Sequence, residues 1–335
     1  MINQGFTFAV APMMDWTDRH CRVFHRMLSR LALLYTEMVV ADAVIHGDRE
    51  YLLGFDGREH RVALQIGGAV PDKLAYASKI GADLGYDEIN LNVGCPSTRV
   101  QSGQFGASLM ANPKLVAACF TAMQEAVNIP VTIKCRIGID AQVPYETLPN
   151  FIETVGAAGC KTFIIHARKA WLDGLSPKDN RTVPPLDYEL VRTMKTAYPD
   201  LAIHLNGGLE TLEQAGEVSS GLDGVMFGRG AYHNPWLLSR VDAEIYGAGK
   251  YVFSRDDIAE QLIDYARHVE TTLLSTKALL RHIMGLYHGE SGARVWRRHL
   301  SAPIRNEKPS EKIRAALGAL QAARIAHKET QEQKC

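Results

Sequence analysis

The sequence lacks the long apolar stretches that mark membrane and exported proteins. No apolar run reaches the roughly 20 residues that span a bilayer. Residues 1–6 have neither the basic start nor the apolar segment of a signal peptide. We therefore expect a cytoplasmic protein that is not attached to a membrane.

Cysteine is scarce and is not arranged to bind metal. The chain has six cysteines, with no CxxC pair and no histidine at the spacing of a zinc site. This pattern speaks against both a disulfide framework and a structural zinc site. We expect a reducing compartment and no metal.

An excess of one sign of charge is also lacking, because 37 Lys and Arg residues balance 37 Asp and Glu residues. The balance hides a difference along the chain. Residues 271–335 carry 12 basic and 5 acidic residues, which leaves 25 and 32 in residues 1–270. A basic C-terminal part is one form of nucleic-acid binding surface. A solvated helical face is the plain alternative, and charge alone does not decide between them.

The chain does have a regular alternation of short apolar runs with amphipathic stretches. Eight runs rich in Val, Ile and Leu are typical of strands buried on both faces of a parallel sheet. They are residues 8–13, 34–40, 62–67, 88–93, 131–136, 162–167, 202–206 and 224–228. Eight such strand–helix repeats predict an α/β fold, a (β/α)₈ TIM barrel. A doubly wound sheet is the competing fold, but the GxGxxG turn expected after its first strand is missing.

The pattern changes near the Gly-Ala-Gly-Lys sequence at residues 247–250, beyond which no strand signal remains. Segments 255–276, 277–288, 293–300 and 308–328 are helix-like instead. We therefore predict two domains, a barrel over residues 1–247 and a small all-helical domain over residues 248–335.

Glycine and polar residues follow the last two predicted strands, at the edge where barrel enzymes build their sites. Asn206, Gly207 and Gly208 follow the seventh strand, and Gly228 and Arg229 follow the eighth. Glycine turns before helix N-termini let backbone N–H groups converge on an anion, and arginine adds a charged fork. We predict a phosphate site here. Tight turns that bind nothing are the alternative.

Three polar side chains are expected inside the mouth of the barrel. Lys134 and His166 end neighbouring strands, where each can contact a cofactor. Each also has an ordinary interpretation, a lysine paired with an acid and a histidine bonded to a backbone carbonyl. Gln65 both donates and accepts hydrogen bonds, which suits the edge of a flat heterocycle.

Cys95 differs from the other cysteines because Gly94 and Pro96 flank it in a turn just past the fourth strand. Most free cysteines are small buried hydrophobes, and we interpret those within the predicted strands and helices in that way. No histidine lies near Cys95 in the sequence to make it a thiolate nucleophile. We therefore predict that Cys95 is a general acid, a role for which a protonated thiol suffices.

Six motifs at successive strand ends resemble those of the tRNA-dihydrouridine synthases. They are APMMDWTDR at residues 11–19, NLNVGCP at 90–96, KCR at 134–136, HAR at 166–168, NGG at 206–208 and GRG at 228–230. DWTDRH at residues 15–20 and RVQSG at 99–103 are similar to the DusA type, which reduces U20 and U20a of the tRNA D-loop. The likeness extends through RVWRRHL at residues 294–300.

The resemblance implies an enzyme that contains FMN, is reduced by NADPH and acts on tRNA. Hydride would pass from flavin N5 to C6 of a flipped uracil, and Cys95 would give a proton to C5. The implied FMN contacts are Pro12, Met13, Met14, Gln65, Lys134, His166, Asn206, Gly207, Gly208, Gly228 and Arg229. The implied uracil and tRNA contacts are Asn92, Lys178, Arg181, Arg294 and Arg297. We expect a monomer.

Two other functions remain open. Another FMN barrel that reduces a small conjugated substrate, such as a dihydroorotate dehydrogenase or an old-yellow-enzyme relative, would explain the phosphate site and Cys95 but not the basic helical domain. A tRNA-binding protein that has lost catalysis would not need Cys95, Lys134, His166 and Arg229 together. Flavin absorbance and salt-dependent tRNA binding distinguish the three possibilities.

Overall fold

The computed structural model describes residues 5–249, 252–271, 277–303 and 307–332, which form two compact units. The first contains Met1–Thr17 and Ala32–Gly228, and the second contains Asp18–Leu31 and Arg229–Cys335. The second unit therefore begins before the predicted boundary at residues 247/248 and also takes in a segment after the first strand. The assignment of catalysis to one domain and tRNA binding to the other stays a prediction.

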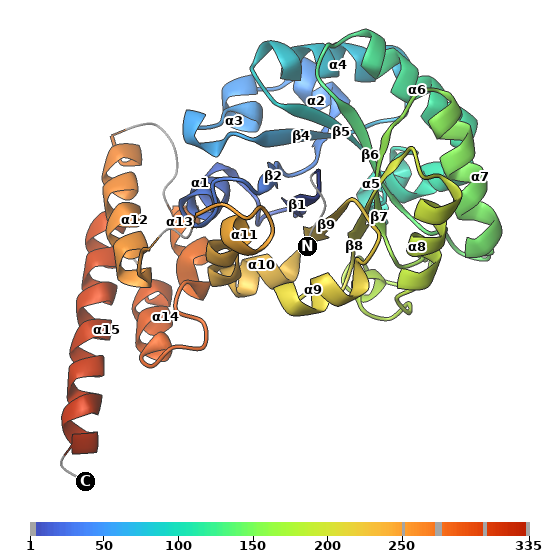
Figure 1. The fold of residues 1–335 in the computed structure, drawn as a ribbon. Helices are drawn as coiled ribbons and strands as arrows, with labels where there is room; N and C mark the ends of the chain where they lie inside the picture. Colours follow the sequence, from blue (N-terminus) through green and yellow to red (C-terminus); the bar gives the residue numbers. More distant parts are fainter. Residues whose placement is uncertain (1–4, 250–251, 272–276, 304–306, 333–335) are drawn as a thin grey trace. The chain divides into compact units, whose positions relative to one another are not determined.

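The first unit is a closed parallel barrel, which confirms the predicted fold class (Figure 1). Its strands are β1 (Thr7–Val10), β2 (Leu33–Tyr35), β3 (Val39–Val40), β4 (Val62–Gly67), β5 (Glu88–Val93), β6 (Val131–Arg136), β7 (Thr162–His166), β8 (Ala202–Asn206) and β9 (Gly224–Phe227). Eight of them pair in the order β2–β1–β9–β8–β7–β6–β5–β4, and β2 pairs with β4 to close the ring.

The predicted strand over residues 34–40 forms two short strands, β2 and β3, instead of one. Thr36 lies between them, and its hydroxyl accepts a hydrogen bond from the Gln65 N–H at 3.1 Å. The same hydroxyl donates to the Glu37 carbonyl at 2.7 Å. A side chain thus takes the place of a backbone partner, so the ladder with β4 is interrupted at this point.

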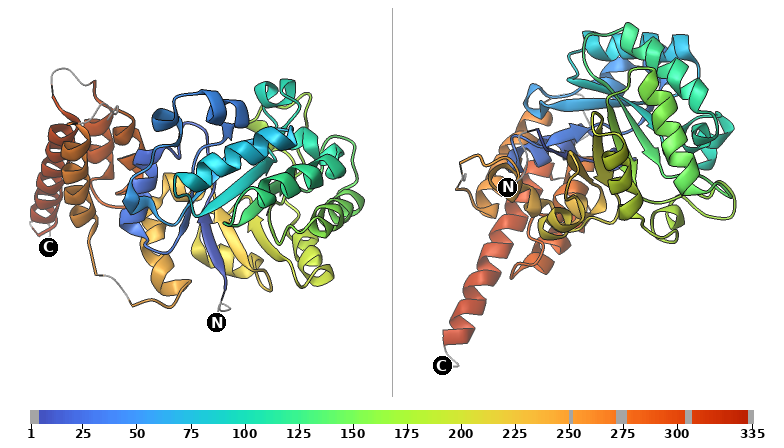
Figure 2. Two further views of the ribbon diagram at one scale, coloured as in Figure 1. Left: turned by 90° about the horizontal axis from the view of Figure 1, so that it is seen from above. Right: turned by 45° about the vertical axis from the view of Figure 1, so that its right-hand side comes forward.

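Helices cover the outside of the barrel, as Figures 1 and 2 show. They are α2 (Ala41–His46), α3 (Arg49–Leu53), α4 (Pro71–Asp83), α5 (Thr98–Ser102), α6 (Pro113–Glu125), α7 (Pro144–Ala157), α8 (Tyr188–Ala197) and α9 (Leu212–Val218), with short 3₁₀ turns η1 (Gly57–Glu59), η2 (Gly106–Ala111) and η3 (Asp179–Arg181). Proline begins α4, α6 and α7, where its fixed φ suits the first helical turn and its missing N–H removes nothing. Because the strands of the barrel are parallel, their carboxyl ends all meet at one end of it.

The barrel interior has an apolar side and a polar side. The apolar side is a buried cluster from β1, β2, β4, β7 and β9 and from Ala11 just after β1, namely Ala9, Ala11, Leu33, Tyr35, Ala63, Ile164 and Met226. The polar side comes from β4, β5 and β6 and consists of Gln65, Glu88, Asn90, Asn92 and Thr132. Because alternate residues of a strand face the same way, positions 88, 90 and 92 of β5 share one face.

The second unit is helical, as predicted. Its elements are α1 (Arg19–Leu28), α10 (Arg229–His233), η4 (Pro235–Leu237), α11 (Leu238–Glu244), α12 (Arg255–Val269), α13 (Lys277–His282), η5 (Ile283–Gly285), α14 (Ala293–Ser301) and α15 (Pro309–Glu332). Trp296 of α14 is fully buried, and its indole N–H donates to the Ile283 carbonyl at 3.0 Å. The predicted helix over residues 255–276 ends in a segment, 272–276, that lies outside the described residues.

A buried polar cluster ties α1, α10 and α13 together within this unit. His282 Nε2 lies 2.9 Å from Asp18 Oδ2, and His282 Nδ1 lies 3.0 Å from the Tyr232 hydroxyl. Burial by itself would raise the pKa of Asp18, but the hydrogen bond and electrostatic attraction to His282, the Cys21 N–H and the nearby His20 together outweigh it and lower the value to about 2. Among the described helices, none combines the length and the apolar character that a membrane crossing requires.

Candidate active site

Cys95 lies on a loop after β5 that is held in place from both sides. Its backbone N–H donates to Asn92 Oδ1 at 2.9 Å, and its carbonyl accepts from the Ala107 N–H at 2.9 Å. Gly106 packs directly beneath, with φ +70°, and a Cβ there would stand 2.6 Å from the Cys95 carbonyl oxygen. Only glycine fits that approach. The Cys95 thiol is half-buried, whereas the other described cysteines are buried.

Arg136, which ends β6, fixes the same loop from within the barrel. Its Nε donates to the Gly94 carbonyl at 3.1 Å, and its Nη1 donates to the carbonyls of Lys169 and Asn180 at 3.0 and 2.9 Å. Asn180 is fully buried in the long loop between β7 and α8. Burial lowers the pKa of Arg136 to about 10, a value that still leaves it cationic at neutral pH.

Lys134 and Asn206, which were both predicted to bind the cofactor, are in direct contact. Lys134 Nζ donates to Asn206 Oδ1 at 3.0 Å, and Asn206 Nδ2 donates to the Met226 carbonyl at 2.8 Å. Burial lowers the pKa of Lys134 to about 8, and the neighbouring Arg136 acts in the same direction. A partly buried cation that donates to a neutral amide is a suitable group to meet a negatively charged ligand.

The turn after β8 requires glycine at two consecutive positions. Gly207 has φ +119° and Gly208 has φ +70°. A Cβ on Gly207 would stand 2.7 Å from Cδ2 of His166, so the histidine ring lies directly against this turn. Gly207 is buried and Gly208 is exposed, so the part of this turn open to an anion is the backbone at Gly208, ahead of α9.

The end of β1 lies next to the end of β9. Ala11 N–H donates to the Phe227 carbonyl at 2.7 Å, and a Cβ on Gly228 would have Met13 Sδ as its nearest neighbour at 3.8 Å. Gly228 is therefore not crowded, in contrast to Gly207. Met13 is itself fixed by Thr17, whose hydroxyl accepts from the Met13 N–H at 2.9 Å. Met14, two positions beyond Pro12, is largely exposed.

The structure therefore brings most of the predicted cofactor residues of the first unit to one end of the barrel. Gln65 and Asn92 are also in contact, through a bond of 2.8 Å from Asn92 Nδ2 to Gln65 Oε1. Asn92 stands opposite Lys134 in the β5–β6 pairing. Arg229 follows Gly228 directly and begins α10 of the second unit.

The basic residues predicted to contact tRNA are all exposed. Lys178 and Arg181 lie on the loop between β7 and α8, at η3. Arg294 and Arg297 lie on α14 of the second unit, and Arg298 is exposed beside them. Positions 294, 297 and 298 share one helical face, away from buried Trp296. Sequence reasoning did not single out Arg298, which lies on the same exposed face.

Sequence reasoning also missed Arg136 and the interior residues Glu88, Asn90 and Thr132. The signal for β5 was present, because a buried strand that carries a polar residue at every second position is unusual. For Arg136 no local signal existed, since its partners come from two separate loops. Among the described residues, no group of three His, Cys, Asp or Glu side chains is placed to hold a metal ion.

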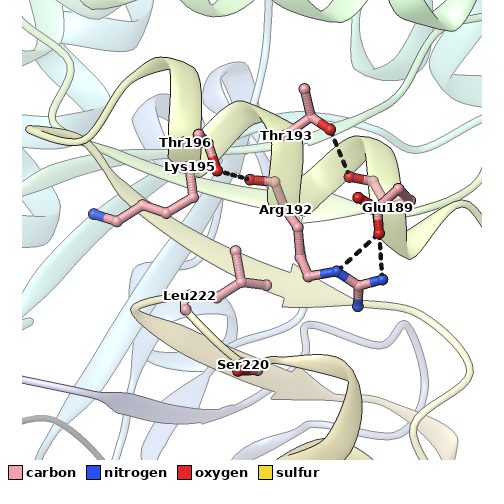
Figure 3. Close-up of a pocket in the computed structure, with 8 residues that line it drawn as sticks. Glu189, Arg192, Thr193, Lys195, Thr196, Ser220 and Leu222 are labelled. Atoms are coloured by element: carbon pink, nitrogen blue, oxygen red, sulfur yellow. Dashed lines mark hydrogen bonds and ion pairs between the residues drawn. The ribbon is translucent and has the colours of Figure 1, made fainter.

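A hollow lies near the turn that precedes β9, at the amino-terminal ends of the strands, and Figure 3 shows the residues that line it. Arg192, Lys195 and Leu222 are among the residues that line it, and it lies between the end of α8 and the turn before β9. Arg192 is paired with Glu189 at 2.6 Å, and Lys195 with Asp223 at 2.9 Å. Loops on this end of a barrel serve stability, so we assign no function to the hollow.

A family model described as dihydrouridine synthase matches residues 9–323 of the chain. The chain belongs to the dihydrouridine synthase family. Among its relatives is a protein of Shewanella oneidensis that is 54% identical over 299 residues, 89% of each chain. Another, from Synechocystis sp., is 54% identical over 293 residues, 88% of each chain. A third, from Vibrio vulnificus, is 51% identical over 88% of this chain and 90% of its own. All three are named tRNA-dihydrouridine(20/20a) synthase.

Solved structures also resemble this dihydrouridine synthase. One is the old yellow enzyme homologue from Zymomonas mobilis, with a TM-score of 0.51 and 11% sequence identity. It covers 75% of this chain and 91% of its own. At that identity the likeness concerns the barrel fold alone.

Proposed function

We propose that this protein reduces the C5=C6 bond of uridine in the D-loop of tRNA, at U20 and U20a, to give 5,6-dihydrouridine. Membership of the dihydrouridine synthase family and the names of the relatives support the reaction and the substrate. The observation that carries the proposal in this chain is Cys95, a half-buried thiol on a loop fixed at the mouth of the barrel.

Cys95 acts as the general acid in this proposal. C5=C6 of uracil is conjugated with the C4 carbonyl, so a hydride added at C6 leaves an enolate that takes a proton at C5. Cys95 gives that proton. Arg136 and Asn92 keep the thiol in place by holding the Gly94 carbonyl and the Cys95 N–H.

The residues at the carboxyl end of the barrel fit an FMN cofactor. Gly207 and Gly208 have left-handed backbone conformations ahead of α9, which suits a phosphate. Gly228 has room beside it, and Arg229 follows. Gln65, Lys134 and His166, with the backbone of Pro12, Met13 and Met14, would surround the flat ring. A bound flavin supplies the hydride, and NADPH is the reductant that we propose.

Lys178 and Arg181 on the barrel loop, with Arg294 and Arg297 on α14, contact the tRNA backbone in this proposal, and Asn92 contacts the uracil. Each cationic side chain near a phosphate releases counterions, so binding weakens as salt rises. The uridine must leave the stacked RNA to reach Cys95. We further propose that residues 1–247 catalyse while residues 248–335 bind tRNA, that the protein is a cytoplasmic monomer, and that it needs no metal.

Mass-spectrometric mapping of dihydrouridine in tRNA tests the function directly. We expect tRNA from cells that lack this protein to carry uridine at positions 20 and 20a, and purified protein with NADPH to restore dihydrouridine there. Unchanged dihydrouridine in the deletion strain, together with no product in the purified reaction, would refute the proposal. Yellow purified protein that reduces dihydroorotate or an enone, but not tRNA, would favour a small-substrate reductase instead.

A further inference from the structure

A chain of hydrogen bonds crosses the polar side of the barrel, starting at the Cys95 loop. The N–H groups of Gly94 and Cys95 donate to Asn92 Oδ1 at 3.1 and 2.9 Å. Asn92 Nδ2 donates to Gln65 Oε1 at 2.8 Å, and Gln65 Nε2 donates to Asn90 Oδ1 at 2.8 Å. The side chains of Asn92, Gln65 and Asn90 in this part of the hydrogen-bond series are each at most 7% exposed.

The chain continues to the other end of the barrel and stops at a carboxylate. Asn90 Nδ2 donates to the Thr132 hydroxyl at 2.8 Å, and that hydroxyl donates to Glu88 Oε1 at 2.6 Å. The Tyr35 hydroxyl also donates to Glu88, at 2.5 Å, but as a side branch. Asn90 is fully buried and Thr132 is 2% exposed, so neither has water as an alternative partner.

The backbone N–H groups at one end give this series of hydrogen bonds a single direction. Backbone N–H groups can only donate, so the atom of Asn92 that faces Gly94 and Cys95 must be its oxygen. Each amide passes this direction on, so Asn90 Nδ2 donates to the Thr132 hydroxyl, which in turn donates to Glu88. The amides of Asn92, Gln65 and Asn90 therefore each have one allowed orientation, and an amide turned over anywhere would place two donors or two acceptors face to face.

We propose that Glu88, Thr132 and Asn90 are positioning residues for the reaction, because they fix the orientation of Gln65 and Asn92 and hold the loop that carries Cys95. None of the three reaches the substrate in this scheme. They act through Asn92, which is the last side chain before the Cys95 backbone.

The direction of the chain also determines what Asn92 can recognise, and this part rests on the proposed function. Asn92 Oδ1 already accepts two N–H groups, and one hydrogen of Nδ2 goes to Gln65. One N–H remains. Asn92 can therefore donate to a carbonyl oxygen of a base but cannot accept from an amino group. A base with a carbonyl at the position it faces fits, and a base with an exocyclic amino group there is rejected.

Thr132→Val tests the chain, because valine has nearly the same shape but neither accepts from Asn90 nor donates to Glu88. Thr132→Ser keeps the hydroxyl and is the rescue variant. Tyr35→Phe is the matched control, since it removes another buried hydroxyl bonded to Glu88 without cutting the chain. The first readout is the alkylation rate of Cys95 in flavin-loaded protein with iodoacetamide, resolved by peptide mass spectrometry.

We expect Thr132→Val to raise the alkylation rate of Cys95 about 5- to 10-fold, which corresponds to the loss of about one buried hydrogen bond. Thr132→Ser and Tyr35→Phe should stay within about twofold of wild type, although Tyr35→Phe also lowers the melting temperature. Equal alkylation rates in Thr132→Val and Tyr35→Phe would overturn the proposal, because the hydroxyl would then serve only stability.

A second readout is the kinetics with tRNA. We expect Thr132→Val to lower kcat about 10-fold with little change in KM, since the phosphate contacts are untouched. Absence of dihydrouridine from every variant, wild type included, with the alkylation difference intact, would refute the proposed function and leave the positioning chain standing. If Thr132→Val does not fold, solvent exchange of the Asn90 and Gln65 side-chain amide protons in wild-type protein decides the matter. Slow exchange supports the chain, and exchange within the dead time of the measurement refutes it.

Discussion

The apolar and polar sides of the barrel interior are built on the same kind of strand yet differ in what they specify. On the apolar side, Ala9, Ala11 and Met226 fill space, and a volume-conserving exchange would pack as well. On the polar side, Gln65, Asn90 and Thr132 belong to a series of hydrogen bonds. Each of their side-chain donors and acceptors in that series has a single allowed partner. Packing tolerates substitution more easily than a directed hydrogen-bond chain does, so the polar side is where the barrel controls geometry.

Cys95→Ala gives the largest effect that we expect on the polar side. The variant should form dihydrouridine in tRNA about 10²- to 10⁴-fold more slowly near neutral pH, which is the usual contribution of a positioned acid. Reduction of the bound flavin by NADPH should be unchanged. Single-turnover measurements separate the two steps, and full tRNA activity would show that the proton comes from another group.

Ile164→Ala tests the apolar side, because Ile164 is fully buried in the apolar cluster. We expect it to lower the free energy of unfolding by about 2–5 kcal/mol through the cavity it leaves. The folded fraction should retain its kcat, since no chain of directed bonds is broken. Urea unfolding with parallel assays measures both, and a large loss of kcat in fully folded protein would erase the contrast between the sides.

Lys134→Met measures what a buried cation at the mouth does to stability. Burial lowers the pKa of Lys134 to about 8, so above that pH the unfolded chain binds more protons than the folded protein does. Stability at this site therefore rises with pH between about 8 and the unfolded-state value of about 10.4. We expect flavin-free Lys134→Met to be more stable than wild type at pH 7 and to lose that advantage as the pH rises toward 10. Urea unfolding across this range measures the difference, and a constant difference would contradict it.

Arg294→Ala and Arg297→Ala give the smallest effect, and they concern neither side of the barrel. Each should weaken tRNA binding by about 1 kcal/mol, roughly fivefold, and reduce the salt dependence by about one phosphate contact. Flavin reduction should stay at the wild-type rate. Filter binding at several salt concentrations measures the change, with Arg298→Ala as a third member of the same face. Slower flavin reduction would show that these arginines contribute to the flavin site, which contradicts their assignment to tRNA binding.

Much of the site could be predicted because its residues follow strands. The eight apolar runs mark the strands, and the residues just past them, such as Cys95, Gly207 and Gly228, had to meet at one end of a barrel. The break at Thr36 was not visible, because it depends on a hydroxyl that bonds to a neighbouring strand. The membership of Asp18–Leu31 in the helical unit was not visible either, since the segment follows directly on the first strand.

The sequence by itself determined the fold class, the helical C-terminal region and the position of Cys95 in a turn just past a strand, because these depend on periodicity and on residues near one another in the chain. Only the tertiary structure decided which groups hold the Cys95 loop. Arg136, Asn90, Thr132 and Glu88 act across neighbouring strands, where partners are set by register and not by sequence distance. A hydrogen bond also has a direction, and along this series of bonds the direction becomes fixed only when the backbone donors of Gly94 and Cys95 are in place.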